Sequence, residues 1–321
     1  MPFRKRIVLF LALLVIFIAS GKAQSCLPEG INFNTQDQID SFPINYPGCT
    51  EIEGNVSIWD WNGNIDNLDS LSVLTSIGGN FWVTGLVSMT NLDGLDNLDS
   101  IGGGLHIRYM QALEDFSALS GVNYIGGFIE IEGNPALRNV DGLAGLQSAY
   151  AVFINANDSL QNIDGLSSIT QITSDLTIVN CPSLTDVTGL VSLNTVNELN
   201  IEVCSSLTSL NGLKALSGSI WRLNIRYNEA LSDISALAGL TDIESYIRIE
   251  NNANLVSLSG LENIQRVGES LAIVGNNSLT SLTGLSGLRS SGYITSDWYS
   301  FKISDNPLLS SLTGLESLDS I

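Results

Sequence analysis

Hydrophobic positions along the chain follow one recurring pattern, which is clearest between Leu271 and Leu288. It begins with the short alternating segment Leu271-Ala272-Ile273 and continues with a leucine at every third residue from Leu279. The alternating segment predicts a β-strand whose odd-numbered side chains point inward. The three-residue spacing lacks the i+4 partners of an amphipathic helix. It predicts a chain that turns repeatedly and buries one side chain at each turn, with a glycine before Leu285 allowing a bend.

The strand residue that anchors this pattern recurs eleven times, at steps of 23 to 25 residues and a last step of 30. Self-similarity at such a period is typical of a solenoid, in which each repeat packs on its neighbours. We predict an all-β-dominated solenoid of about eleven coils, a right-handed parallel β-helix of leucine-rich-repeat type. The anchors are Ile58, Val83, Ile107, Ile131, Ile154, Ile178, Ile201, Ile225, Ile249, Ile273 and Ile303.

An asparagine stands three residues after the anchor in many coils. A buried asparagine at this position could bond to backbone groups of the turn and to the asparagine of the next coil. We therefore predict a structural asparagine ladder rather than a ligand site. Its members are Asn134, Asn157, Asn228, Asn252, Asn276 and Asn306.

Residues 1–23 have the pattern of a secretory signal peptide, with a basic start at Arg4 to Arg6 and an apolar run from Ile7 to Ala19. The run has 13 residues, which is too short to span a bilayer. Acylation of Cys26 is an alternative, but the preceding Ala23-Gln24-Ser25 matches a lipoprotein site poorly. We expect an exported protein, secreted or at the cell surface, without a transmembrane segment in the mature chain.

The chain is strongly acidic, with 33 acidic and 13 basic residues and a net charge of −20. Four of the basic residues lie in residues 1–23, so 9 remain against 33 and the net charge of the remainder is −24. A surface of this sign repels nucleic acid and anionic membranes. Nucleic acid is therefore excluded as a partner.

Residues 24–49 do not follow the repeat and are predicted to cap the open end of the solenoid, which comprises residues 50–321. Cys26 and Cys49 bracket this capping segment. In an exported protein, two cysteines around such a unit favour a disulfide.

The segment Cys49-Thr50-Glu51-Ile52-Glu53-Gly54-Asn55-Val56-Ser57-Ile58 resembles the opening of receptor L-domains, in which a cysteine precedes a T-x-I-x-G-x-L-x-I strand. L-domains are the ligand-binding modules of insulin- and EGF-receptor ectodomains. The later units, such as Leu279 to Leu285, are similar to the leucine-rich L-domain-like repeats of bacterial and fungal surface proteins. This resemblance covers residues 26–321. It implies a right-handed solenoid of parallel strands and a binding or structural role rather than catalysis.

The chain departs from these receptors in its many coils, its few cysteines and its lack of a kinase or transmembrane segment. Receptor signalling therefore does not carry over. Near Ile321, where a further coil would begin, the pattern contains no closing cap. We therefore expect either a truncated sequence or a missing sorting or anchoring segment.

Two further features allow more than one interpretation. Cys181 and Cys204 occupy the asparagine position of adjacent coils, where parallel strands about 4.8 Å apart permit either a disulfide or two buried thiols. The loop from Asp60 to Asp66 faintly resembles a calcium loop, but its glycine is misplaced and Leu71 stands where the closing glutamate belongs. A tight turn at Asn62-Gly63 is the simpler interpretation, and no metal or cofactor is predicted.

The outward positions of the first strands carry aromatic and charged residues that suit sugar or protein recognition. The alternative is that the tryptophans only shield the irregular first coils. The stretched tenth coil adds three aromatic residues on an insertion, which either contact a partner or fold back over the core. The strand-face candidates are Trp59, Trp82, His106, Arg108, Glu130 and Phe153, and the insertion carries Tyr293, Trp298 and Tyr299.

No catalytic pattern accompanies these residues. The single histidine lies three coils from the cysteines, and a glycan-cleaving β-helix would need clustered carboxylates with a basic residue as catalyst. Arg226 and Arg248 beside Glu202 and Glu250 are interpreted instead as ion pairs on a solvated sheet. We expect a recognition or adhesion module that binds protein or glycan, with a structural spacer as the alternative.

Overall fold

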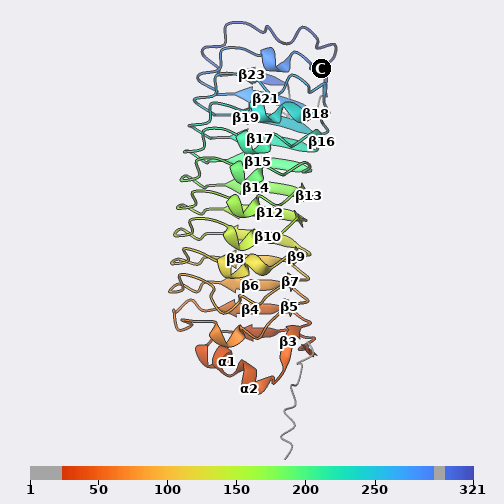
Figure 1. The fold of residues 1–321 in the computed structure, drawn as a ribbon. Coiled ribbons are helices and arrows are strands. Elements are labelled where there is room, and N and C mark those ends of the chain that lie inside the picture. Colours follow the sequence, from red (N-terminus) through yellow and green to blue (C-terminus); the bar gives the residue numbers. More distant parts are fainter. Residues whose placement is uncertain (1–23, 293–300) are drawn as a thin grey trace, which may run out of the picture.

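The computed structural model describes residues 24–292 and 301–321. Figure 1 shows a column of stacked coils that rises from a helical cap at the N-terminal end. The described residues form a 12-stranded parallel sheet that runs the length of the column. Its strands, in order, are β2 (Ile31–Phe33), β4 (Val56–Trp59), β6 (Phe81–Thr84), β8 (Leu105–Arg108), β10 (Phe128–Glu132), β12 (Ala151–Asn155), β14 (Asp175–Val179), β15 (Glu198–Glu202), β17 (Arg222–Arg226), β19 (Tyr246–Glu250), β21 (Ser270–Val274) and β23 (Lys302–Ser304).

The predicted register is confirmed along this sheet. Ile58 pairs with Val83, and the anchors that follow pair in the same way up to Ile273 and Ile303. The sheet also contains one strand that the repeat did not predict. β2 belongs to the capping segment, and its Phe33 pairs with Ile58, so the cap supplies the first rung of the sheet.

Short strands form a second side of most coils, along the right edge of the column in Figure 1. They also pair in parallel, in three separate sheets. These strands are β1 (Gln24–Cys26), β3 (Cys49–Ile52), β5 (Ser76–Ile77), β7 (Ser100–Ile101), β9 (Tyr124–Ile125), β11 (Ser148–Ala149), β13 (Gln171–Ile172), β16 (Gly218–Ile220), β18 (Leu240–Ile243), β20 (Arg266–Val267) and β22 (Ser290–Ser291).

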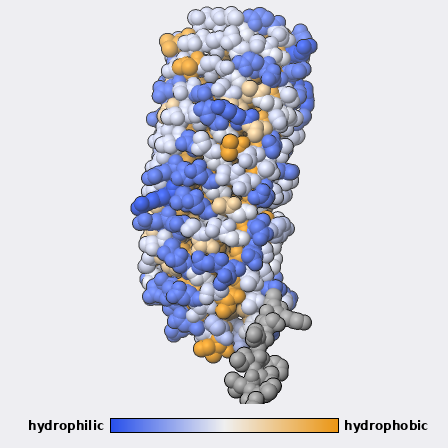
Figure 2. All heavy atoms as spheres, in the orientation of Figure 1, coloured by the Kyte–Doolittle hydropathy of each residue, from blue (hydrophilic) through white to orange (hydrophobic). Residues whose placement is uncertain are grey.

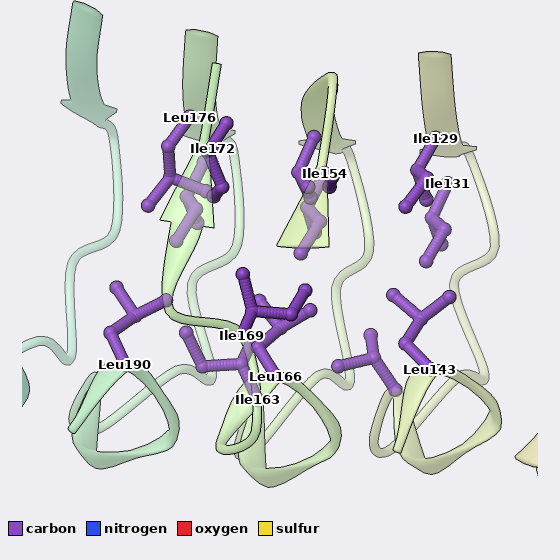
Figure 3. Packing of buried hydrophobic residues seen from close by; sticks show 14 of the residues in the cluster. Ile129, Ile131, Leu143, Ile154, Ile163, Leu166, Ile169, Ile172, Leu176 and Leu190 are labelled. Carbon is purple, nitrogen blue, oxygen red and sulfur yellow. The ribbon is translucent and has the colours of Figure 1, made fainter. Parts of the chain in front are cut away.

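The predicted turns after the asparagine position contain single-turn 3₁₀ helices that stack along a third side. Figure 3 shows leucines and isoleucines of these turns meeting the inward side chains of the strands, so each coil encloses a continuous aliphatic core. The helices are η1 (Asp69–Leu71), η2 (Ser117–Gly121), η3 (Asp141–Leu143), η4 (Asp164–Leu166), η5 (Thr188–Leu190), η6 (Asn211–Leu213), η7 (Ser235–Gly239) and η8 (Thr283–Leu285).

Five of these 3₁₀ turns, η3 to η6 and η8, have a glycine before the leucine, and there the neighbouring coil leaves no space for a Cβ. At Gly212 an added Cβ would lie 1.7 Å from the carbonyl oxygen of Val187, and at Gly284 it would lie 2.0 Å from that of Leu258. Neither glycine has a positive φ. The reason expected from the sequence was therefore wrong. The glycine lets one coil approach the backbone of the coil before it.

The asparagine ladder is confirmed. The Oδ1 atom of Asn252 accepts from the backbone N–H of Asn228, and its Nδ2 donates to the carbonyl oxygen of Ile225 at 2.9 Å. Asn228 and Asn276 repeat both bonds one coil away, to Cys204 and Ile201 and to Asn252 and Ile249. All six asparagines are at most 9% exposed. Their amides therefore satisfy backbone groups that would otherwise be buried without a partner.

Cys181 and Cys204 are buried free thiols in the same column, which is the second of the two alternatives left open by the sequence. The thiol of Cys204 lies 3.9 Å from the carbonyl oxygen of Ile178, in the position where an asparagine would place Nδ2. The pKa of Cys181 is raised by the hydrogen bond of this thiol with Cys204 and by its burial. Because a thiol is a weaker hydrogen-bonding group than an amide, the ladder is weakest at these two coils.

One corner of the coil requires a left-handed residue directly after the long strand. Gly85, Gly133 and Gly275 supply it in three coils. Non-glycine residues with φ between 54° and 57° supply it in others, including Tyr109 and Val203. A β-branched side chain rarely adopts this conformation, so stacking of the coils fixes the corner against the local preference of the residue.

The cap contains two short helices, α1 (Gln36–Asp40) and α2 (Phe42–Asn45), which the sequence did not predict. They lie at the lower end of the column in Figure 1. Phe42 packs edge-on against Phe33 with ring centroids 5.7 Å apart, and both are fully buried. The predicted disulfide between Cys26 and Cys49 is confirmed. It joins β1 to β3 and ties the first residues of the cap to the first full coil.

The proposed signal peptide, residues 1–23, and the aromatic residues Tyr293, Trp298 and Tyr299 lie outside the described residues. Within the described part of the chain, no helix is long and apolar enough to cross a membrane. On the face seen in Figure 2, hydrophilic side chains cover broad areas and hydrophobic ones form separate spots.

Candidate functional site

A groove of about 700 Å³ crosses the outer face of the long sheet between β8 and β14. We call it the strand-face groove. Its wall residues come from outward positions of four adjacent strands and from the corner after β14, so a rigid parallel sheet positions all of them. They are His106, Arg108, Phe128, Glu130, Glu132, Phe153, Asn155, Thr177, Val179 and Asn180.

Two phenylalanines form the apolar part of the groove. Phe128 opens β10, and Phe153 lies on the neighbouring β12 at a position two residues further along the strand direction. Their ring centroids are 5.8 Å apart. Phe128 also meets Tyr150 edge-on at 5.2 Å and remains 46% exposed. Because outward strand positions have no core to enter, these rings stay available at the surface.

Three polar side chains form the opposite part of the groove. The Nδ2 atom of Asn155 donates to Glu132 at 3.1 Å, and the Nδ2 atom of Asn180 donates to Oδ1 of Asn155 at 3.1 Å. This chain of bonds fixes the orientation of each amide. Hydrogen-bonding capacity remains on Glu132 and Asn180, because an amide and a carboxylate each have more positions than these bonds use.

A charged and aromatic cluster closes the groove on the side of β8, the first of the strands that line it. Arg108 donates a hydrogen bond to Glu130, and Nδ1 of His106 lies 2.9 Å from the same carboxylate oxygen. On its other side, the His106 ring stacks on Trp82 at 5.4 Å with an interplanar angle of 13°. Partial burial opposes ionisation of Glu130, but the bonds from Arg108 and His106 outweigh it and hold the pKa of Glu130 below its usual value.

The six strand-face residues predicted from the sequence are therefore only partly brought together. His106, Arg108, Glu130 and Phe153 line the groove. Trp82 lies next to it and supports His106. Trp59 lies in the first coil, is 41% exposed and does not line the groove.

The prediction missed Phe128, Glu132, Asn155 and Asn180. Glu132 and Asn155 occupy the outward position that follows the anchor, so the confirmed register would have found them. Phe128 stands three residues before its anchor, beyond the strand length assumed from the sequence. Asn180 lies at the left-handed corner (φ 54°), and no sequence signal placed that corner beside the sheet.

The C-terminal half of the same face is occupied by pairs among its own side chains. Arg226 lies 3.2 Å from Glu250 and 3.9 Å from Glu202, which confirms the predicted ion pairing for this arginine. The guanidinium of Arg248 lies over the ring of Tyr246 at 4.8 Å. Here the charged groups satisfy one another and cover the sheet.

One aspartate organises the loop from Asp60 to Asp66. The carboxylate of Asp60, which is 3% exposed, accepts hydrogen bonds from the backbone N–H groups of Asn62, Asn64 and Ile65. Burial opposes ionisation of Asp60, but these bonds prevail and lower its pKa. Across residues 24–292 and 301–321, no group of three His, Cys, Asp or Glu residues is placed to hold a metal ion.

Comparison with known proteins identified no relative of this chain. No protein-family model matches the chain, and a search of curated proteins finds no match. The candidate site therefore depends on its geometry alone.

Proposed function

We propose that the chain is an exported recognition or adhesion module of the cell surface, which binds a protein or glycan through its strand face without catalysis. The observation that carries the proposal is the strand-face groove, where two outward-facing phenylalanine rings and oriented polar groups lie side by side. Its volume falls within the range of about 300–1,000 Å³ that is typical of ligand sites.

The groove is suited to binding because little ordering remains to be done. Phe128 and Phe153 stand on adjacent central strands, and Asn155 is already held by Glu132 and Asn180. A ligand that covers the rings gains apolar burial and meets polar groups whose rotamers are already fixed, which lowers the entropy cost of association.

Export is supported by two independent observations. The Cys26–Cys49 disulfide is the kind of bond that persists in oxidising compartments. The basic and apolar pattern of residues 1–23 predicts a secretory signal. The resemblance of residues 49–58 to receptor L-domains, which bind ligands, agrees with a recognition role.

A non-catalytic role is proposed because the one histidine of the chain is engaged on both sides. His106 stacks on Trp82 and lies against Glu130, which Arg108 also binds. A glycan-cleaving enzyme is the competing possibility. Mass spectrometry of any bound glycan after overnight incubation with the protein should recover it at its original length, and shortened or unsaturated products would support the enzyme.

The test of the proposal is a binding screen with the full exported chain against arrays of glycans and of surface proteins. We expect at least one micromolar binder, and we expect the Phe128→Ala/Phe153→Ala double variant to lose it. Trp221→Ala is the matched control, because Trp221 is also exposed and occupies in its coil the position that Tyr150 has next to the groove. A ligand that binds the double variant as tightly as the unchanged chain would contradict the groove as the binding site.

The second candidate is a structural spacer, and the ladder favours it. Its hydrogen bonds continue through coils of both halves and would stiffen the column along its axis. The spacer predicts that no array member binds. It also predicts that both phenylalanine substitutions leave surface attachment unchanged in cells that display the protein.

A further inference from the structure

A second hollow adjoins the strand-face groove across the edge of the long sheet that is formed by the N-terminal ends of its strands. It has a volume of about 170 Å³ and lies between β9 and β11, on the side of the coil formed by the short strands. Tyr124 and Tyr150 flank it. Since Tyr150 also contacts Phe128 of the groove edge-on at 5.2 Å, one aromatic path leads from the groove around the edge into the second hollow.

The path is long compared with a single sugar or a single amino-acid side chain. From Phe128 to the corner after the strand, the groove spans about five residues at roughly 3.3 Å each, about 16 Å in all. The tyrosines extend it further. A site of this shape fits an extended polymer that follows the strand direction and bends over the edge.

Its chemistry suits a glycan better than a folded protein. A protein partner needs about 800 Å² of matched surface on each side, whereas this site is an elongated path with aromatic rings toward the beginning of the strands and polar side chains at their ends. Sugar rings present C–H faces that pack on aromatic rings. They also carry hydroxyls that can donate to the carboxylate of Glu132 and can both donate to and accept from the amide of Asn180.

The charge of the groove restricts which sugars it accepts. Two carboxylates, Glu130 and Glu132, face one guanidinium, Arg108, which is already bound to Glu130. Glu132 therefore leaves an excess of negative charge, and the chain as a whole carries a net charge of −20. Uronic acids and sulfated sugars would be repelled, while hydroxyls and amino groups would be attracted.

We infer that the strand-face groove and the Tyr124–Tyr150 hollow form one extended site for a linear glycan built of neutral or amino sugars. This inference rests on the proposed function and narrows it to one ligand class. It places the middle of the glycan on Phe128 and Phe153 and one end on the two tyrosines.

The experiment titrates the full exported chain with oligosaccharides of defined length by calorimetry. The probes are di- and hexasaccharides of β-1,4-linked glucose, N-acetylglucosamine and glucosamine, with hexagalacturonate as the anionic comparison. At least one neutral or amino hexasaccharide should bind ten times more tightly than its disaccharide, and hexagalacturonate should bind more weakly than that hexasaccharide. Tyr150→Ala should weaken the hexasaccharide about tenfold and leave the disaccharide unchanged, while Trp221→Ala should alter neither.

Other outcomes overturn the inference and separate it from the proposed function. Suppose that a protein binds, that its binding is lost in the Phe128→Ala/Phe153→Ala variant, and that no neutral or amino glycan binds. This result would refute the inferred glycan ligand and would still support the proposed recognition function. Preference for hexagalacturonate, or equal affinity for the two lengths, would also refute it. Absence of every glycan and protein binder would refute both. Thermal unfolding of each variant checks that the fold is retained.

Discussion

The two halves of the long sheet have the same backbone and opposite surfaces. Between β6 and β14 the outward positions carry Trp82, His106, Phe128 and Phe153, and the last three of these line the strand-face groove. From β15 to β19 the outward positions hold arginines and glutamates that pair across strands, as Arg226 does with Glu202 and Glu250. Stacking therefore fixes where outward side chains meet, while their identity decides whether they bind one another or leave a site for a ligand.

The asparagine column passes through both halves, and buried cysteines replace asparagine at two of its positions, Cys181 and Cys204. These coils lie at the boundary between the aromatic and the charged region. The buried column therefore serves stability in both halves, and the difference between them is confined to the surface. Four predictions follow this division, and the first concerns the shared column.

Removing one ladder amide should have the largest effect. In Asn228→Ala the N–H of Cys204 and the carbonyl of Ile201 lose their side-chain partner, and Oδ1 of Asn252 keeps only the backbone N–H of residue 228. Since each unsatisfied buried group costs about 1–3 kcal/mol, we expect a loss of about 3 kcal/mol in the free energy of unfolding, measured by urea denaturation. The exposed Asn254→Ala is the control. A change below 0.5 kcal/mol in Asn228→Ala would contradict the role of the column.

Substitution in the groove should affect binding and leave stability nearly unchanged. Phe153→Ala removes a ring that lies on the surface, so we expect binding of the screened ligand to weaken at least tenfold, or about 1.4 kcal/mol. Trp221→Ala, at an exposed position of the charged half, should bind as the unchanged chain does. Equal losses of binding affinity in the two variants would contradict a functional difference between the halves.

Substitution in the charged half should have the reverse pattern. Arg226→Ala leaves Glu202 and Glu250 without their common partner. Because the pairs are partly solvated, we expect a loss of about 1 kcal/mol that shrinks in 1 M salt, with ligand affinity unchanged. The matched substitution Arg138→Ala removes a more exposed pair with Glu114 and should cost less. A loss of affinity in Arg226→Ala would extend the site into this half.

The smallest effect concerns pH. Because the folded-state pKa of Glu130 is lowered, its contribution to stability is present above the unfolded pKa of about 4.3 and is lost as the pH falls through the folded value. Glu130→Gln should therefore unfold more easily than the unchanged chain at pH 7, by less than about 1 kcal/mol. The difference should fade below about pH 4. Glu29→Gln, on an exposed turn of the cap, is the control. A difference that persists at pH 2 would assign the effect to packing instead.

The repeat alone determined the architecture of this protein. Aliphatic residues spaced by the same steps from Ile58 to Ile303 can be buried together only if the coils stack in register, and this requirement placed the parallel sheet and the column around Asn228. The cap disulfide followed from two cysteines around the segment that precedes the repeat. For such features, local spacing and the need for burial are sufficient.

Tertiary structure decided the rest, because the remaining features depend on contacts between coils at positions without periodicity. The groove needs Phe128 beside Phe153 and Asn180 beside Asn155, and these pairs come from different coils and different parts of the turn. The space that excludes a Cβ at Gly212 is likewise set by the neighbouring coil. Sequence specifies which residues recur, whereas the stacking distance and the corner conformation determine which of them touch.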